Sequence, residues 1–115
     1  MVHEPAIRAY YRCFAARDRA GLERLLLPTF RHVSPFGVYE DRDRMLDEIW
    51  PNVGRTWAID IQVFGDGSEF MVRYRHAGER SGSMAEYFRF DGDRIAEVET
   101  FTGVRQRYGT SGEFL

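Results

Sequence analysis

Residues 84–102 read MAEYFRFDGDRIAEVETFT, and this stretch decides the fold. Two runs in it, residues 84–90 and 94–102, alternate with period two and are rich in aromatic and β-branched side chains, a pattern typical of strands. The pair Asp91-Gly92 between them is a hairpin turn signal. The stretch therefore predicts two antiparallel strands joined by a tight turn.

The same pattern extends toward the N-terminus. Residues 56–64 and 69–77 also alternate, and Asp66-Gly67 between them is a second turn signal, so four strands form a predicted antiparallel meander. A further short strand is expected at residues 29–34, before the turn Pro35-Phe36-Gly37. The tail after Gly103 has little periodicity and is expected to be irregular.

Helical spacing replaces strand spacing in the first part of the chain. A first helix over residues 5–17 is predicted by four apolar side chains on one face, Ile7, Tyr10, Tyr11 and Phe14. Asp18 is expected to cap a second helix that ends at Pro28, and Asp41 or Asp43 a third that ends before Pro51. Three helices followed by a meander predict an α+β domain.

Composition limits the classes of protein to which the chain can belong. With 115 residues, 43% hydrophobic and 30% charged, residues 1–115 fit one globular domain. The formal charge of −2 is not gathered into blocks, which argues against nucleic acid and anionic membranes as partners. No secretory leader or membrane span is apparent, so the cytoplasm is the default compartment. Cys13 is the single cysteine, which excludes an intrachain disulfide and a thiolate metal cluster, and no cofactor is expected.

Several segments together resemble the nuclear transport factor 2-like superfamily, in its SnoaL-like and ketosteroid-isomerase-like branch. The resemblance covers most of the chain and rests on the order and spacing of residues 6–11, 18–21, 34–37 and 87–95, which read AIRAYY, DRAG, SPFG and YFRFDGDRI. It implies a cone-shaped, curved antiparallel sheet with three N-terminal helices packed on its concave side around an apolar pocket. It also implies a homodimer formed through the outer sheet face.

The resemblance places three polar residues at functional positions. Ketosteroid isomerases of this branch use a strand-one carboxylate as base, with a tyrosine and a protonated acid that donate to the enolate oxygen. By this likeness Tyr10 takes the tyrosine position and Glu86 the acid position, whereas Ser34 stands where the base would be. A serine hydroxyl needs an activating partner to accept a proton near neutral pH.

His32 is the preferred candidate base, because it shares a strand face with Ser34 and its ordinary pKa lies near 6.5. The alternative is a core or rim histidine bonded to backbone or water. Glu86 falls on the face of Met84 and Phe88, where burial would raise its pKa, unless it pairs with Arg73 or Arg75. Tyr10 could be its hydrogen-bond partner, or simply fill the core.

The remaining candidates are expected to line the pocket. They are Phe14, Ser34, Trp50, Trp57, Val72, Tyr74, Phe88, Val98 and Thr100. His76 could join His32 and Glu86 around a metal, but the spacing matches no metal motif, and no metal site is predicted.

Two functions remain open at this point. One is an enzyme, resembling ketosteroid isomerases or polyketide cyclases, that binds a small, largely apolar carbonyl compound and catalyses acid–base isomerisation, cyclisation or dehydration. The other is a noncatalytic module for ligand binding or dimerisation, since one fold serves many tasks.

Overall fold

The computed structural model describes residues 3–102, so the predicted irregular tail after Gly103 lies outside the described part. Helices and strands follow one another in the order α1 (Glu4–Ala16), α2 (Arg19–Leu25), β1 (Leu26–Ser34), β2 (Gly37–Tyr39), α3 (Arg42–Ile49), the 3-10 helix η1 (Trp50–Asn52), β3 (Thr56–Asp66), β4 (Glu69–Gly78), β5 (Gly82–Asp91) and β6 (Arg94–Thr102).

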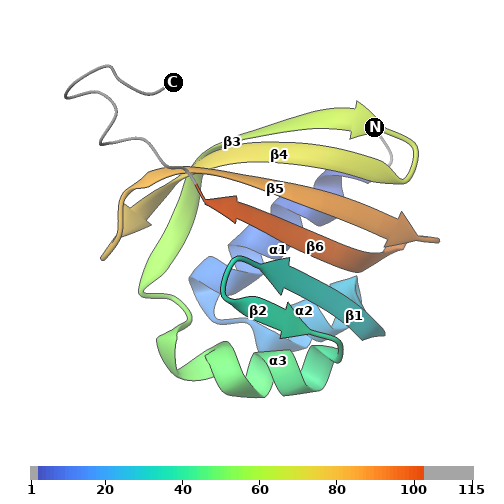
Figure 1. Cartoon of the computed structure of the whole chain (residues 1–115), viewed down its shortest axis with the longest axis horizontal. Coiled ribbons are helices and arrows are strands. Elements are labelled where there is room, and N and C mark those ends of the chain that lie inside the picture. Colours follow the sequence, from blue (N-terminus) through green and yellow to red (C-terminus); the bar gives the residue numbers. More distant parts are fainter. Residues whose placement is uncertain (1–2, 103–115) are drawn as a thin grey trace.

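The strands form one curved, open sheet in the order β2-β1-β6-β5-β4-β3 (Figure 1). Strands β3 to β6 pair antiparallel, which confirms the predicted meander. Strand β1 instead runs parallel to β6, with His32 opposite Val98, so the prediction of a wholly antiparallel sheet is wrong and the sheet is mixed. Side-chain alternation identifies a strand but carries no information on the direction of a distant neighbour.

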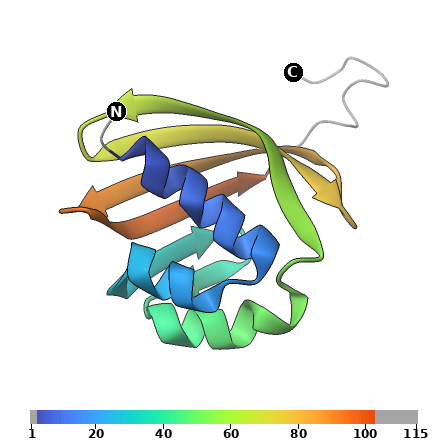
Figure 2. The same ribbon diagram turned by 180° about the vertical axis from the view of Figure 1, so that it is seen from behind.

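The three helices lie on one face of the sheet, behind it in Figure 1 and in front of it in Figure 2. Helix α1 crosses the sheet, and α2 and α3 lie beside β1. Apolar side chains from the helices and from the inner sheet face form one core, in which Ile7, Leu22, Leu46, Phe30, Phe88 and Ile95 are completely buried. Each such side chain contributes roughly 1.5–3 kcal/mol by leaving water.

Hydrogen bonds at the helix starts confirm the predicted caps. The Asp18 carboxylate accepts from the Gly21 amide at 2.9 Å, and the Asp41 carboxylate, rather than that of Asp43, accepts from the Arg44 amide at 3.0 Å. Helix α2 ends at Leu25 and β1 begins at once, so the strand starts earlier than predicted and Pro28 lies within it. Strand β2 was not predicted.

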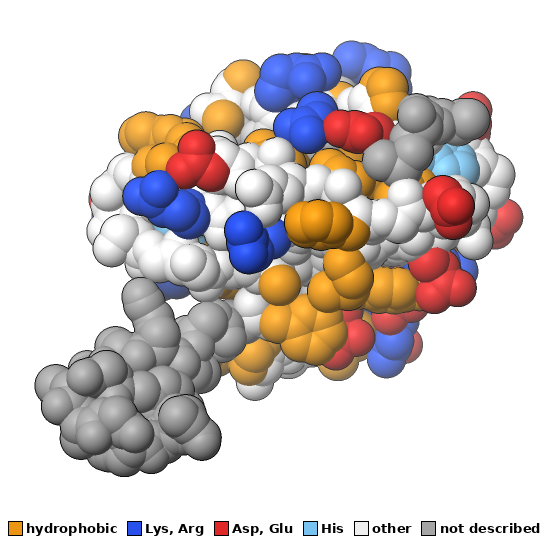
Figure 3. All heavy atoms as spheres, turned by 90° about the horizontal axis from the view of Figure 1, so that it is seen from above, with side chains coloured by type: hydrophobic (Ala, Val, Ile, Leu, Met, Phe, Trp, Pro, Cys, Tyr) orange, Lys and Arg blue, Asp and Glu red, His pale blue; other side chains and the backbone are white. Residues whose placement is uncertain are grey.

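Side chains along the strands alternate between the outer face of the sheet and the core, as expected. Along β4, Val72 and Tyr74 are buried while Arg73 and Arg75 are exposed. Three large apolar side chains remain exposed on this outer face, namely Phe64, Met71 and Phe101. Figure 3, which looks onto the β3 side of the molecule, shows exposed hydrophobic side chains interspersed with Arg and with Asp or Glu. Within residues 3–102, no helix has the length and apolar character needed to span a bilayer.

The turn between α1 and α2 depends on the absence of a side chain at Gly21. A Cβ there would lie 2.5 Å from Asp18 Oδ2 and 2.6 Å from Cys13 Sγ. We expect Gly21→Ala to lower the free energy of unfolding by about 1–2 kcal/mol, because the added methyl displaces the capping carboxylate or the thiol. Urea denaturation followed by circular dichroism measures this change.

Helix propensity alone predicts the opposite sign, since alanine stabilises a helix interior by about 1 kcal/mol over glycine. The exposed neighbour Ala20 gives the matched control, and Ala20→Gly should cost about that amount. If Gly21→Ala were as stable as wild type or more so, the steric explanation would be wrong.

Candidate functional site

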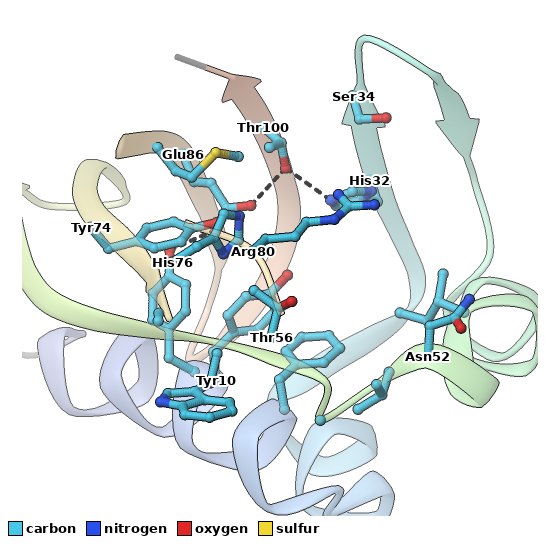
Figure 4. Close-up of a pocket in the computed structure, with 18 of the residues that line it drawn as sticks. Tyr10, His32, Ser34, Asn52, Thr56, Tyr74, His76, Arg80, Glu86 and Thr100 are labelled. Atoms are coloured by element: carbon cyan, nitrogen blue, oxygen red, sulfur yellow. Dashed lines mark hydrogen bonds between the residues drawn. The ribbon is translucent and has the colours of Figure 1, made fainter. Parts of the chain in front are cut away.

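A cavity of about 410 Å³ lies between α1, the inner sheet face and the segment that follows α3 (Figure 4). This volume is in the range of small-molecule sites. Its walls are mainly aromatic and aliphatic, and include Phe14, Ile49, Trp57, Ala58 and Met84. Polar groups from five separate elements face the same space: Tyr10 and Tyr11 of α1, His32 of β1, Tyr74 and His76 of β4, Glu86 of β5 and Thr100 of β6.

Glu86 is the central polar group, since its side chain is buried and 5% exposed. The register of β5 places it opposite Thr100 of β6. The Tyr11 hydroxyl donates to Glu86 Oε1 at 2.7 Å, and the Thr100 hydroxyl donates to Oε2 at 2.6 Å. Burial raises the pKa of Glu86, and hydrogen bonds from Thr100, Tyr11 and Tyr74 oppose that rise without cancelling it.

No cation neutralises this carboxyl group within residues 3–102. Arg75 pairs with Asp60 at 2.9 Å on the outer side of the sheet, and Arg73 also faces outward. The alternative of a Glu86–Arg pair is therefore wrong, because strand alternation directs both arginines away from the cavity. Burial without a neighbouring cation keeps the pKa of Glu86 raised although the hydroxyl groups lower it, so this carboxyl group takes up a proton more readily than an exposed one.

The hydrogen-bond partner of Glu86 on α1 is Tyr11, so of the two alternatives for Tyr10 the one that made it the partner of Glu86 is wrong by one residue. The two rings stand nearly perpendicular, with centroids 5.3 Å apart. Tyr10 packs its ring against Phe14 and Phe88 and also lines the cavity. Burial and the nearby Glu86 raise the pKa of Tyr10, which keeps its hydroxyl protonated and able to donate.

His32 joins this network through Thr100. Its Nε2 lies 3.1 Å from Thr100 Oγ1, which completes a chain of hydrogen bonds from Tyr11 through Glu86 and Thr100 to His32 (Figure 4). Burial lowers the pKa of His32, so the imidazole is neutral near pH 7. Thr100 has one hydroxyl hydrogen and gives it to Glu86, so His32 carries its own hydrogen on Nε2 in this arrangement. Nδ1 is then the lone-pair acceptor.

The predicted catalytic residues Tyr10, His32 and Glu86 thus line one cavity, together with Phe14, Ser34, Trp57, Tyr74 and Thr100. The other predicted lining residues do not line it. Val72, Phe88 and Val98 are packed in the core, on the same sheet face but beneath the helices. Trp50 instead lies under the guanidinium groups of Arg17 and Arg19, at 5.3 and 5.9 Å from the ring centroid.

Sequence reasoning missed Tyr11 and Arg80 as cavity residues. Tyr11 belongs to the four apolar residues that share one face of the first helix. Helical spacing does not show which of the adjacent residues Tyr10 and Tyr11 points toward Glu86. Arg80 belongs to the polar connection between β4 and β5, where no periodicity marks the direction of a side chain. Among the described residues, no group of three or more His, Cys, Asp or Glu side chains is arranged to hold a metal ion.

His76 has an unusual environment for a cavity residue. Its Nδ1 is buried and has no hydrogen-bond partner within the described chain. Burial and the positive charge of Arg80 lower the pKa of His76, so its imidazole is neutral. An unsatisfied buried polar atom costs about 1–3 kcal/mol.

No protein-family model matches the sequence, and no curated protein matches it. Solved structures do match. A candidate ketosteroid isomerase from Kribbella flavida superposes with a TM-score of 0.82 at 14% identity, covering 92% of this chain and 81% of that chain. A candidate isomerase of the SnoaL-like family from Agrobacterium tumefaciens gives 0.72 at 15% identity, covering 90% and 98%.

A third neighbour is an NTF2-like protein of unknown function from Cytophaga hutchinsonii, with a TM-score of 0.74, 10% identity, and coverage of 85% of this chain and 87% of that one. At these identities the likeness establishes the fold and leaves the chemistry open. The chain therefore has the fold of the nuclear transport factor 2-like superfamily, as its sequence resemblance predicted.

Proposed function

We propose that the cavity binds a small, largely apolar carbonyl compound and that the protein catalyses proton transfer at the carbon next to the carbonyl group, as in an isomerisation. The observation that carries the proposal is the hydrogen-bond chain from His32 through Thr100 to the buried Glu86. Two structural neighbours named as a candidate ketosteroid isomerase and a candidate SnoaL-like isomerase support the reaction class.

The chain of hydrogen bonds gives the proton a destination. His32 Nδ1 accepts the α-proton, its Nε2 proton moves to Thr100 Oγ1, and the Thr100 hydroxyl proton moves to Glu86 Oε2. The carbon–hydrogen bond breaks, one proton is gained by Glu86, and the electron pair remains on the substrate as an enolate. The negative charge is thereby transferred from Glu86 to the substrate without a new unpaired charge in the cavity. The reverse sequence at another carbon completes an isomerisation.

Two features make this transfer favourable. Burial raises the pKa of Glu86, which brings its proton affinity closer to that of an imidazole. The Tyr10 hydroxyl lines the cavity and stays protonated, so it can donate to the enolate oxygen as the charge develops. The same side chains would also suit the dehydration or cyclisation of a related carbonyl compound.

Ser34 explains why His32 takes the role of base in this proposal. The Ser34 hydroxyl accepts from the Phe36 amide at 3.1 Å and lies 3.4 Å from the Gly37 carbonyl, so it stabilises the turn between β1 and β2. His32, by contrast, is the residue of β1 that offers a basic lone pair to the cavity.

Deuterium exchange of a small ketone tests the catalytic part. Wild-type protein should accelerate exchange of the C1 protons of 2-tetralone in D₂O, followed by proton NMR. His32→Gln should lose about 10²-fold or more of this rate, and Tyr10→Phe about tenfold or more, because each removes a group that acts in the proposed transition state. Tyr87→Phe is the matched control, since it removes an exposed Tyr–Glu hydrogen bond to Glu69 on the outer face.

A wild-type rate no higher than that of buffer would contradict catalysis. If 2-tetralone nevertheless bound, as measured by saturation-transfer NMR, the noncatalytic pocket would be the better description.

Thr100 separates a proton relay from simple packing. Thr100→Val keeps the shape of the side chain but removes the hydroxyl group, and should lower the exchange rate by about 10²-fold. Thr100→Ser retains the hydroxyl and should keep the rate within about tenfold of wild type. Equal losses in the two variants would indicate that Thr100 has only a structural role.

We also propose that two copies associate through the outer sheet face. Phe64, Met71 and Phe101 expose 54%, 41% and 42% of their surface there and would gain by burial. Light scattering after size-exclusion chromatography should give the mass of a dimer for wild type, and that of a monomer for the double variant Met71→Glu/Phe101→Glu. A monomeric wild type at micromolar concentration would refute this association.

A further inference from the structure

The cavity has a second polar end, away from Glu86. Asn52, Thr56, His76 and Arg80 line both the main cavity and an adjoining polar recess, which is completed by Arg55 and Glu79. These residues come from η1, β3, β4 and the connection to β5. Figure 4 shows Arg80 extended across the pocket, with His76 close to it.

This end carries a net positive charge. Arg55 and Glu79 pair at 2.7 Å and neutralise each other. Within the described residues, no carboxylate lies at ion-pair distance from Arg80, although eight of the fourteen arginines in residues 3–102 have such a partner. Arg80 is exposed and also lines the cavity, and its guanidinium group can hold a carboxylate with two parallel N–H donors.

His76 supplies an unused hydrogen-bonding atom in the same wall. Its Nδ1 is buried and without a partner in residues 3–102. A neutral imidazole can carry its hydrogen on Nδ1 and donate it to an oxygen atom. Because this nitrogen is closed off from solvent, a ligand oxygen held by Arg80 would satisfy it after the imidazole turns about its Cβ–Cγ bond, whereas an apolar ligand would leave it unsatisfied.

We propose that the ligand of this cavity is a carbonyl compound that also carries a carboxylate group, bound at the far end by Arg80 and His76. The inference rests on the proposed function for the position of the carbonyl group, and adds the class of substrate.

The strand register sets the length of such a ligand. His76 lies four residues further along β4 than Val72, which pairs with Glu86. Four residues of a strand span about 13 Å, so after the lengths of the side chains are allowed for, the Glu86 end and the His76 end of the cavity lie on the order of 10 Å apart. A frame of two fused rings provides this separation and is consistent with a cavity of about 410 Å³.

Two probes of equal shape test the inference: 6-acetyl-2-naphthoate, which has a carboxylate, and 6-acetyl-2-naphthamide, which is neutral. Isothermal titration calorimetry at low salt should give a dissociation constant at least about tenfold lower for the acid with wild-type protein, and the preference should shrink as salt is added. Arg80→Gln should abolish the preference and leave the affinity for the amide unchanged.

Arg73→Gln is the matched control, because it removes the same charge from the outer face of β4 and should keep the preference. His76→Leu should lower the affinity for the acid more than that for the amide. Equal affinities for the two probes in wild type, loss of binding of both, or a preference that survives Arg80→Gln would each overturn the inference.

The two proposals can fail separately. Exchange of neutral 2-tetralone needs no contact with Arg80, so a catalytic wild type without the carboxylate preference would overturn the substrate class alone. A carboxylate preference in a protein that shows no exchange would instead leave the binding site and remove the catalysis.

Discussion

The arrangement of the site depends on one constraint: the Glu86 carboxyl group is buried on the inner face of the sheet, and residues 3–102 place no cation beside it. Register along β5 fixes its position, and burial of a lone carboxylate is costly unless its oxygen atoms are satisfied. Hydroxyl groups of Tyr11 and Thr100 meet this requirement. Because both are uncharged, the cost of the charge is reduced but not removed, and the group keeps a raised pKa. A purely structural residue at this position would more simply be apolar.

The two hydroxyl groups that bind Glu86 come from opposite ends of the described chain. Helix α1 contributes Tyr11 from above the sheet, while the meander brings β6 against β5 so that Thr100 faces Glu86. Both contacts are made by residues whose backbone is fixed in regular structure, which keeps the hydrogen bonds aligned. The groups at the other end, by contrast, come from η1 and from the connection between β4 and β5, where a ligand could adjust the geometry more easily.

Much of this organisation could be predicted from the sequence, because it follows from local periodicity. Alternation placed Glu86 on the inner face beside Phe88, and the helical spacing of the first helix placed Tyr10 and Tyr11 on one buried face of that helix. Periodicity does not show the exact direction of a side chain within a buried face, nor which strands pair when they are far apart in the sequence. It could not distinguish Tyr11 from Tyr10 as the partner of Glu86, nor a packed position such as Val98 from one that lines the cavity. It gave no sign that β1 runs parallel to β6.

That parallel pairing also determines when the site can exist during folding. His32 and Thr100 are separated by 68 positions in the chain, yet they are in contact because β1 lies beside β6. Such a long-range contact requires a large loop to close, and its entropic cost is recovered only when nearly all of the domain has formed. The helices and the meander can therefore assemble before the hydrogen bond between His32 and Thr100 has formed. The protein would then become active only when the pairing of β1 with β6 is complete. Substitutions that weaken this pairing could therefore abolish activity without changing any side chain in the cavity.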